Sequence, residues 1–336
     1  MIYNYYTKLN KKCTMKFEYE KYICSIESTK ETLEKFGVAI VEKILVDEEC
    51  TDIIDKMWSH FEHITQKWKT PINRNNTATY REIFKLFPTH GMLFQHFNIG
   101  HTQISWNIRQ HPKIIEIFCN IWDCTSDELL VSFDGISFGV KPEDTNRGYD
   151  QKTPGFHTDQ SYTIPDFKCI QSWVTALDVE EGDATLSIYE GSHKYHQEFA
   201  KTFNILNKDN WFKLAPEHKQ FYLNKGLEET RICCLKGSLV LWDSRTIHYG
   251  ANPIRGRAHP KLRSIIYLCY MPREQISAKD LQKKRKAFNE LRTTSHWTDR
   301  CTMFPKTPRT YGGVLPEITP IPSPILNSIG RRLAGF

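Results

Sequence analysis

The sequence predicts a mainly β fold with flanking helices, in which the strands form a jelly roll or barrel. Hydrophobic residues make up 40% and aromatic residues 12% of the 336 residues, as in a folded globular protein. Helical spacing of apolar residues occurs before and after the middle of the chain, so helices do not alternate with strands as in a parallel α/β sheet. Short runs rich in β-branched residues recur in between, separated by turn residues: 129–140, 167–177, 184–189, 231–242 and 263–271.

One strand and two helices are expected before these runs. The segment 37–46 is rich in β-branched residues and predicts a strand. A helix follows from about Asp47, a suitable N-cap residue, and a second helix is expected over 110–122, starting near Pro112. Both helices are predicted from apolar residues at helical spacing: Cys50, Ile53, Ile54, Met57, Trp58, Phe61 and Ile64, then Ile114, Ile115, Ile117, Phe118 and Ile121.

The run 231–242 contains two local signals. Adjacent cysteines, Cys233 and Cys234, would point to opposite faces of a strand. The pair Lys236-Gly237 predicts a hairpin turn between two strands.

The chain is expected to return to helix after the β-rich part. The segment 277–292 predicts a helix that begins with a capping box formed by Ser277 and Asp280. The tail 304–336 is rich in proline and glycine, so we expect it to wrap the surface and to end in a short helix near Leu326–Leu333.

Composition predicts a soluble, intracellular protein of the cytoplasm. No stretch approaches the roughly 18 consecutive apolar residues of a membrane helix, and Met1 to Lys12 lack the apolar centre of a signal peptide. The ten cysteines include no CxxC pair, so free thiols are expected rather than a disulfide framework or a zinc site. The net charge is +6, and residues 251–336 are basic. A basic segment attracts anions, but we interpret most of these charges as solvated.

Two histidines and an aspartate predict a metal site. His157 and Asp159 lie two residues apart, so on a strand both side chains point to the same face. His248 closes the apolar run 239–248. Two imidazoles and one carboxylate form the facial triad of non-haem Fe(II) oxygenases, which leaves positions open for a keto acid and O2. An H-x-D pair alone also occurs by chance, so the prediction depends on the strands, His248 and the arginine that follow it.

Arg263 is a charged residue inside the apolar run 262–268. A guanidinium that points inward is suited to hold a carboxylate through two hydrogen bonds, and the far carboxylate of 2-oxoglutarate is the expected partner. An edge-strand arginine or an internal salt bridge is the alternative interpretation. Arg255 and Arg257 are closer to His248 in sequence but lie in a predicted loop, so they are second candidates.

Other polar residues allow two interpretations each. Asp134, a carboxylate in an apolar strand, is expected either to form a hydrogen bond within the core or to face the substrate. Asp243 and Arg245 precede His248 and would either fix the orientation of that ligand or form a plain salt bridge. His193 follows a Gly-Ser pair and is expected to be structural rather than a ligand.

Four segments carry a resemblance to a known family: Gly-Phe-His-Thr-Asp-Gln at 155–160, then 173–177, 190–194 and 237–248. They resemble motifs of the phytanoyl-CoA dioxygenase family, most densely over residues 129–273. A less characterised branch of that family is similar over most of the chain after about residue 35. The segments similar to that branch are Gly100 to Trp106, Arg109, 131–135, Met271 to Arg273 and 293–297.

This resemblance implies a double-stranded β-helix, the cupin-like form of the jelly roll. It implies Fe(II) as cofactor, 2-oxoglutarate as cosubstrate, and three catalytic iron ligands, His157, Asp159 and His248. It further implies that Arg263 holds a carboxylate of 2-oxoglutarate and that Trp173 lines the cosubstrate pocket. The sequence departs from the family in two ways. Gly250 stands where well-studied members have a serine that contacts 2-oxoglutarate, and Arg263 lies further from the last histidine than their arginine does.

We predict an N-terminal extension over 1–34 and one dioxygenase domain over 35–336, with a β-helix core at about 129–273 and a helical, Pro-rich part at 274–336. The predicted enzyme uses 2-oxoglutarate and O2 to hydroxylate or otherwise oxidise a small organic substrate, lipophilic or acyl, and releases succinate and CO2. The alternatives are a nucleic-acid- or protein-modifying oxygenase and a non-catalytic binding protein on the same fold. Nucleic acid is not an expected partner, no membrane span is expected, and the substrate and oligomeric state stay open.

Overall fold

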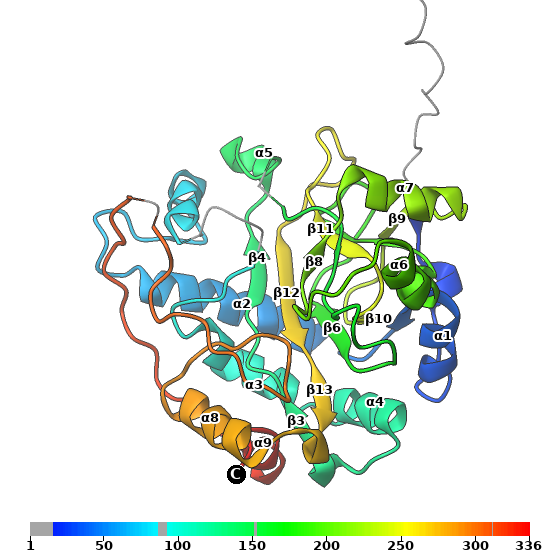
Figure 1. Ribbon diagram of the computed structural model, residues 1–336. Helices are drawn as coiled ribbons and strands as arrows, with labels where there is room; N and C mark the ends of the chain where they lie inside the picture. The colour runs from blue at the N-terminus through cyan, green and yellow to red at the C-terminus, as the bar shows by residue number, and fades with distance from the viewer. Residues whose placement is uncertain (1–15, 87–92, 151–152, 311) are drawn as a thin grey trace, which may run out of the picture.

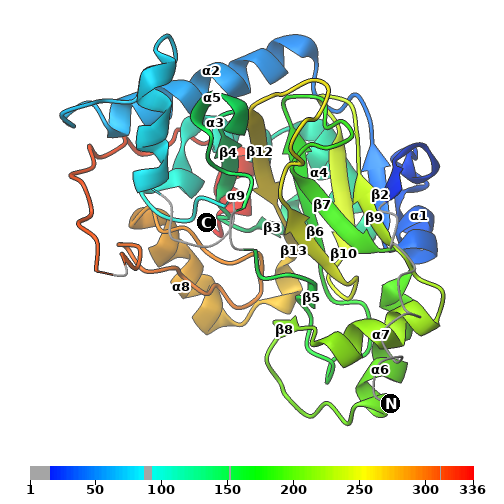
Figure 2. The same ribbon diagram turned by 90° about the horizontal axis from the view of Figure 1, so that it is seen from above.

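The protein consists of two β-sheets that pack face to face, with helices around them (Figure 1, Figure 2). The computed structural model describes residues 16–86, 93–150, 153–310 and 312–336. None of the helices in these ranges is both long and apolar enough to cross a membrane. This arrangement is the double-stranded β-helix that the resemblance implied.

The first sheet is six-stranded and antiparallel except for the parallel pair of β1 with β9. In spatial order its strands are β1 (Lys16–Glu18), β9 (Glu229–Ile232), β7 (Thr185–Tyr189), β11 (His248–Ala251), β5 (His157–Thr158) and β8 (Phe212–Lys213). Strand β1 belongs to the segment that the sequence set apart as an extension, and residues 1–15 of that segment lie outside the described residues.

The second sheet is five-stranded and antiparallel throughout. In spatial order its strands are β2 (Val38–Val41), β10 (Leu239–Asp243), β6 (Ile170–Thr175), β12 (Arg263–Leu268) and β4 (Ile136–Gly139). A short two-stranded sheet joins β13 (Tyr270–Pro272) to β3 (Leu129–Val131).

Alternate residues of the five-stranded sheet enter two separate cores, because successive side chains of a strand point to opposite faces. On β6, Val174 belongs to the larger core beneath the helices, and its neighbour Trp173 belongs to the core between the two sheets. Leu186 and Ile188 of β7 complete that second core from the six-stranded sheet. The strands therefore present their inner face to a space enclosed by both sheets.

Helices cover the outer face of the five-stranded sheet and the ends of the barrel (Figure 1). Helices α2 and α4 contribute apolar residues such as Phe61 and Phe118 to the larger core. Helices α6 and α7 lie together near β8 at one end of the six-stranded sheet (Figure 2). The bounds are α1 (Thr29–Phe36), α2 (Asp47–Ile64), α3 (Gln103–Arg109), α4 (Pro112–Trp122), α5 (Pro142–Thr145), α6 (His196–Thr202), α7 (Pro216–Asn224), α8 (Ala278–Asn289) and α9 (Ser328–Leu333).

Several predicted elements are confirmed, and the strand content is corrected. Helices α2, α4 and α8 occur where apolar spacing and capping predicted them, and α9 occurs at the expected end of the Pro-rich tail. Ser277 accepts a hydrogen bond from the Asp280 N–H at 3.0 Å. The description as mainly β overstates the strands, since helical residues outnumber strand residues. The strands are short, and the segment after β7 contains two helices, α6 and α7. The apolar periodicity of α7 is weak, because Tyr222 is its one buried residue.

Two local predictions were wrong in detail. Gly237 does form a turn, but not a hairpin, because β9 and β10 lie in different sheets. Its φ of 75° and a backbone neighbour, the Leu45 carbonyl oxygen 2.5 Å from any added Cβ, require glycine here. Asp47 is the first residue of α2 rather than its N-cap, which is Val46, whose N–H donates to the Glu49 carboxylate at 2.9 Å.

Candidate metal centre

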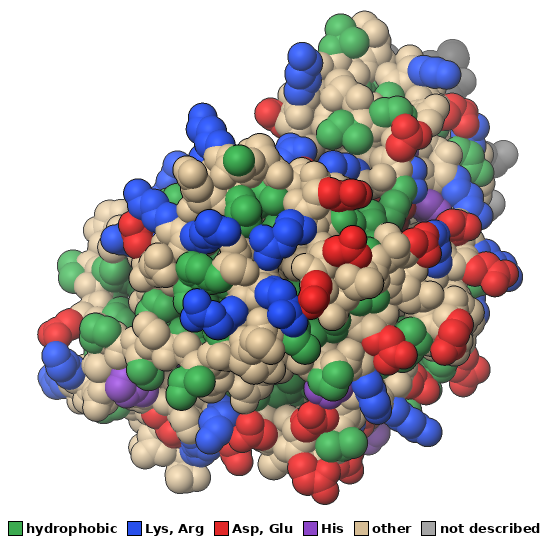
Figure 3. All heavy atoms as spheres, turned by 90° about the horizontal axis from the view of Figure 1, so that it is seen from below, with side chains coloured by type: hydrophobic (Ala, Val, Ile, Leu, Met, Phe, Trp, Pro, Cys, Tyr) green, Lys and Arg blue, Asp and Glu red, His purple; other side chains and the backbone are tan. Residues whose placement is uncertain are grey.

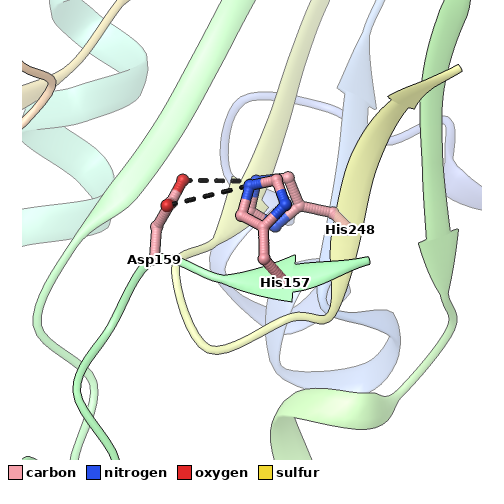
Figure 4. A group of neighbouring side chains, drawn as sticks. All are labelled: His157, Asp159 and His248. Atoms are coloured by element: carbon pink, nitrogen blue, oxygen red, sulfur yellow. Dashed lines mark ion pairs between the residues drawn. The ribbon is translucent and has the colours of Figure 1, made fainter. Parts of the chain in front are cut away.

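The two histidines and the aspartate predicted from the sequence lie together at one end of the barrel (Figure 4). Strands β5 and β11 are neighbours, and His157 pairs directly with His248 across them. The Nε2 atom of His248 lies 3.3 Å from Asp159 Oδ2, and the Nε2 atom of His157 lies 3.8 Å from Asp159 Oδ1. One donor atom from each residue lies within 4.8 Å of the other two, so a single metal ion can contact all three.

Backbone carbonyls fix the tautomer of both imidazoles. His157 Nδ1 lies 2.8 Å from the Gly155 carbonyl oxygen, and His248 Nδ1 lies 2.9 Å from that of Thr246. A carbonyl only accepts, so each Nδ1 carries the hydrogen and each Nε2 presents a lone pair toward the aspartate. Burial lowers the pKa of His157 to about 4, which keeps that ring neutral and able to bind metal near neutral pH.

The segment between β10 and β11 links the chain around Asp159 to the chain that leads to His248. The Ser244 carbonyl accepts hydrogen bonds from the Asp159 N–H at 3.2 Å and from the Thr158 hydroxyl at 3.0 Å. The Ser244 hydroxyl in turn donates to the Gln160 side chain at 2.8 Å. His248 follows Ser244 by four residues, so this network fixes its distance from Asp159.

Gln171, which the sequence analysis did not single out, orients the carboxylate. Its side-chain amide on β6 donates to Asp159 Oδ2 at 3.0 Å. Burial alone would raise the pKa of Asp159, but the adjacent imidazoles of His157 and His248 outweigh it and lower that pKa. The carboxylate therefore stays ionised, as a metal ligand must. Gln171 lies two residues before Trp173 on β6, so both side chains point to the same face of the strand. This spacing is the only sequence signal that places Gln171 at the site.

The triad opens into a cavity of about 580 Å³ that runs into the barrel. Trp173 lines it and is buried, and Tyr267 lies beside Trp173 on the neighbouring strand β12. Arg263 lines the same cavity, where it donates to the Ser137 hydroxyl at 2.8 Å and to the Ala184 carbonyl. Among the described residues no carboxylate pairs with Arg263, so its charge is available to an anionic ligand.

The two other candidate arginines are occupied elsewhere. Arg257 is buried and forms salt bridges with Glu143 and Asp183, and it does not line the cavity of the triad. Arg255 is exposed and pairs with Asp150 at 3.1 Å. The position of the guanidinium thus favours Arg263 over both.

The remaining polar candidates take structural positions, with one exception. His193 contacts the Glu34 carbonyl at 3.0 Å, as expected of a structural histidine. Asp243 and Arg245 form a salt bridge at 2.7 Å. Asp134 satisfies both interpretations, since it accepts a hydrogen bond from Ser132 at 2.9 Å and also lines the cavity.

Three further cavity residues were missed by the sequence analysis as parts of the site. His296 and Trp297 come from the segment after α8, and Trp211 comes from the segment before β8. The ring of Trp211 lies 5.9 Å from that of His157. The resemblance had marked 293–297 as a similar segment, but no local pattern placed it beside residues more than a hundred positions earlier.

A double-stranded β-helix with two imidazoles and one carboxylate at its end is the arrangement of non-haem iron enzymes with a facial triad. The family model described as phytanoyl-CoA dioxygenase matches residues 33–256. The chain belongs to the phytanoyl-CoA dioxygenase family, and its cofactors are Fe(II) and 2-oxoglutarate.

Individual relatives are distant. The Ava biosynthesis cluster protein O of Aspergillus versicolor is 28% identical over 215 residues, which cover 61% of this chain and 66%, just under two thirds, of that protein. Two solved structures show a similar fold at 13% identity. A putative oxidoreductase from Salmonella typhimurium LT2 aligns with a TM-score of 0.58, and the alignment covers 94% of this chain and 86% of the oxidoreductase. The GlcNAc Inducible Gene 2 protein of Candida albicans has a TM-score of 0.51, covering 78% and 67%.

Proposed function

We propose that His157, Asp159 and His248 bind one Fe(II) and that the protein uses 2-oxoglutarate and O2 to hydroxylate a small organic substrate. The observation that carries this proposal is the convergence of two Nε2 lone pairs and one carboxylate on a cavity that also contains an uncompensated arginine. The balanced reaction adds one oxygen atom of O2 to a C–H bond and the other to succinate, with loss of CO2. Bound iron supplies the activation of O2.

The side chains of the cavity have separate tasks in this proposal. Arg263 holds the far carboxylate of 2-oxoglutarate through its planar guanidinium, and the Ser137 hydroxyl keeps that guanidinium in place. Trp173 forms part of the apolar wall beside the cosubstrate and excludes water from it. The hydrogen bond from Gln171 keeps Asp159 turned toward the metal rather than toward the protein interior.

We propose a single catalytic domain over residues 35–336. Its Pro-rich tail packs on the helical layer, where the Thr319 N–H donates to the Ile64 carbonyl at 3.0 Å. Nine cysteines of the described chain are free, which supports a reducing compartment such as the cytoplasm.

The basic C-terminal part supports a small-molecule substrate over a nucleic acid. Lys284 of α8 is buried and donates to the Val131 carbonyl, so the basic segment 251–336, most of whose charges were expected to be solvated, is partly structural. Arg273 donates to the Arg332 carbonyl at 2.7 Å, and Arg285 donates to that of Gly335 at 2.6 Å. Figure 3 shows Lys and Arg side chains on the lower face with Asp and Glu side chains directly beside them, unlike a continuous basic groove.

The test is iron-dependent turnover of 2-oxoglutarate. Purified protein loaded with Fe(II) is supplied with 2-oxoglutarate and O2, and succinate is measured by mass spectrometry with a panel of small organic molecules. Asp159→Ala should reduce succinate formation more than about 100-fold, because it removes a metal ligand while loss of a group that merely orients a ligand costs about 10–100-fold. Asp52→Ala on the exposed side of α2 is the matched control. Wild-type turnover in Asp159→Ala would contradict the proposal.

A further inference from the structure

Part of the cavity wall has no role in the proposed reaction. We call it the outer wall and define it as Asp134, Ser295, His296, Trp297 and Arg300. The residues come from two distant parts of the chain, the link between β3 and β4 and the segment after α8. Their side chains line the same cavity as His157 and Asp159, so a molecule that extends from the metal along the cavity can contact them.

Hydrogen bonds fix the two parts of the outer wall to each other. The Thr294 N–H donates to the Phe133 carbonyl at 3.0 Å, and the Phe133 N–H donates to the Thr294 hydroxyl at 3.0 Å. Asp134 and His296 follow these paired residues by one and two positions. The segment after α8 is itself closed by the Ser295 N–H, which donates to the Thr302 carbonyl at 2.9 Å. The outer wall is thus a built surface rather than a loose loop.

Asp134 has unused hydrogen-bonding capacity although it is about nine-tenths buried, with 9% exposure. Its Oδ2 atom accepts from the Ser132 hydroxyl at 2.9 Å, and among the described residues no donor reaches Oδ1 and no cation forms a salt bridge with it. Burial raises the pKa of Asp134, an effect that the nearby His296 partly offsets. A buried carboxyl group without a full set of partners is costly, so a donor from a bound molecule would stabilise it.

His296 is the natural counterpart of Asp134. Neither ring nitrogen forms a hydrogen bond with a described residue, and Nε2 is out of contact with solvent. Its electrostatic effect reaches both Asp134 and Asp159, which places the ring near the outer wall and near the metal ligands. A neutral imidazole supplies one donor and one acceptor, whereas the carboxylate only accepts.

The charges of the cavity favour a neutral ligand over an ammonium ion. Arg263 and Arg300 both line it, and the Arg300 guanidinium lies 4.7 Å from the Trp297 ring. Arg263, which has no carboxylate partner among the described residues, opposes a second cation in the cavity; Arg300 is already paired with Asp299 at 3.3 Å, and the Asp159 carboxylate is directed at the metal. The indoles of Trp211 and Trp297 offer flat apolar surface to the body of such a ligand.

We infer that Asp134 and His296 position a neutral, hydroxyl-bearing substrate beside the iron, with its O–H donating to the Asp134 carboxylate and its oxygen accepting from His296. The inference rests on the proposed function for the statement that the bound alcohol is the substrate. The remainder of that molecule is apolar and packs on Trp211 and Trp297. The hydroxyl anchors the substrate, and the carbon presented to the iron lies elsewhere in the molecule.

The experiment compares an alcohol with its methyl ether, which keeps the oxygen acceptor and removes the donor. The probes are 2-phenylethanol and cyclohexylmethanol, each with its methyl ether. Dissociation constants are measured by calorimetry on the Fe(II)–2-oxoglutarate protein without O2 and on the metal-free protein. The wild-type protein should bind each alcohol about tenfold more tightly than its ether, the ratio expected for one hydrogen bond to a charged group.

Three variants separate the two roles. Asp134→Leu should reduce the alcohol-to-ether ratio to about one, and Asp134→Asn to about threefold, because a neutral acceptor is roughly half as strong. His296→Leu should weaken alcohol and ether alike and leave the ratio unchanged, since both oxygens accept from the ring. Asp52→Asn and His259→Leu, two surface changes outside the cavity, are controls. Should Asp134→Leu not fold, the isosteric Asp134→Asn carries the test.

The outcomes distinguish this inference from the proposed function. Three outcomes would overturn the inference while succinate formation stands. They are equal affinity for alcohol and ether in the wild-type protein, no binding of either alcohol, and an alcohol-to-ether ratio that stays unchanged in the folded Asp134 variants. An intact ratio in a protein that forms no succinate from 2-oxoglutarate would leave the alcohol site in place and overturn the proposed function.

Discussion

The cavity has an inner half, formed by the triad, Arg263, Trp173 and Tyr267, and an outer half, which is the outer wall defined above. The two halves are built from different kinds of structure. The inner half lies on paired strands, where Trp173 of β6 sits opposite Tyr267 of β12 and His248 of β11 sits opposite His157 of β5. The outer half lies on links between elements, where Asp134 and His296 depend on a few hydrogen bonds between distant segments. Strand pairing fixes side chains by many backbone bonds, so it suits groups that must keep one geometry, as the proposed metal and cosubstrate ligands must.

The halves also differ in how far their polar groups are satisfied within the protein. Asp159 has Gln171, both triad histidines have backbone carbonyls, and Arg263 has the Ser137 hydroxyl. Asp134 has only Ser132, and His296 has no hydrogen-bond partner among the described residues. This contrast teaches that the triad and Arg263 are held in place before any ligand binds, whereas Asp134 and His296 keep hydrogen-bonding capacity for one.

The largest effect within the inner half is expected at Arg263. Arg263→Ala should raise the KM for 2-oxoglutarate by the equivalent of about 2–5 kcal/mol, because the far carboxylate loses a charge-assisted contact and stays unpaired. Iron affinity should change little. Arg263→Lys should recover only part of the loss, since an ammonium group lacks the planar fork. Steady-state kinetics with varied 2-oxoglutarate measures this.

Arg255→Ala is the control for Arg263, because Arg255 is exposed, pairs with Asp150 and does not line the cavity of the triad. A normal KM for 2-oxoglutarate in Arg263→Ala together with a raised KM in Arg255→Ala would show that the loop containing Arg255 binds the cosubstrate. It would contradict the assignment of cosubstrate binding to strand β12.

A smaller effect is expected at Gln171. Gln171→Leu keeps the size of the side chain and removes the hydrogen bond to Asp159, so iron affinity should fall about 10–100-fold, as for other groups that orient metal ligands. Equilibrium titration with Fe(II) under anaerobic conditions gives the affinity. Gln220→Leu in α7, outside the cavity, is the matched change. Unchanged iron affinity in Gln171→Leu would show that the backbone alone orients the carboxylate.

The last effect is on stability alone and concerns His101, which contacts the segment before the outer wall through a hydrogen bond to the Arg292 carbonyl at 2.9 Å. Burial, with a further contribution from Arg109, lowers the pKa of His101 to about 3. In the unfolded chain a histidine has a pKa of about 6.5, so between these values only the unfolded state takes up the proton. Stability is therefore complete above about pH 6.5 and is lost as the pH falls, by about 1.4 kcal/mol per pH unit for this group.

His101→Gln isolates this contribution. Denaturant unfolding at about pH 7 and pH 5 should show that the wild-type protein loses about 2 kcal/mol more than the variant over that interval. An identical loss in both proteins would mean that the buried His101 does not contribute to the loss of stability in acid.

The sequence predicted much of the fold because the signals are local. Apolar residues at helical spacing located α2 and α4, and the Ser277–Asp280 capping box located the start of α8. Where local signals were weak, the prediction failed: α6 and α7 had no clear pattern, and the turn at Gly237 could not reveal that its two strands enter different sheets. Sheet membership depends on contacts far apart in sequence, which no local pattern encodes.

The sequence by itself determined the candidate ligands. The spacing of His157 and Asp159 dictates a shared face, and the isolated charge of Arg263 in an apolar strand requires a partner, so both follow from the chemistry of a short segment. Only the tertiary structure decided that Gln171 reaches Asp159, that Arg257 is consumed by two carboxylates, and that Asp134 meets His296 in one cavity. Those facts arise when distant segments pack together, because a hydrogen bond or salt bridge depends on separation in space and not in sequence.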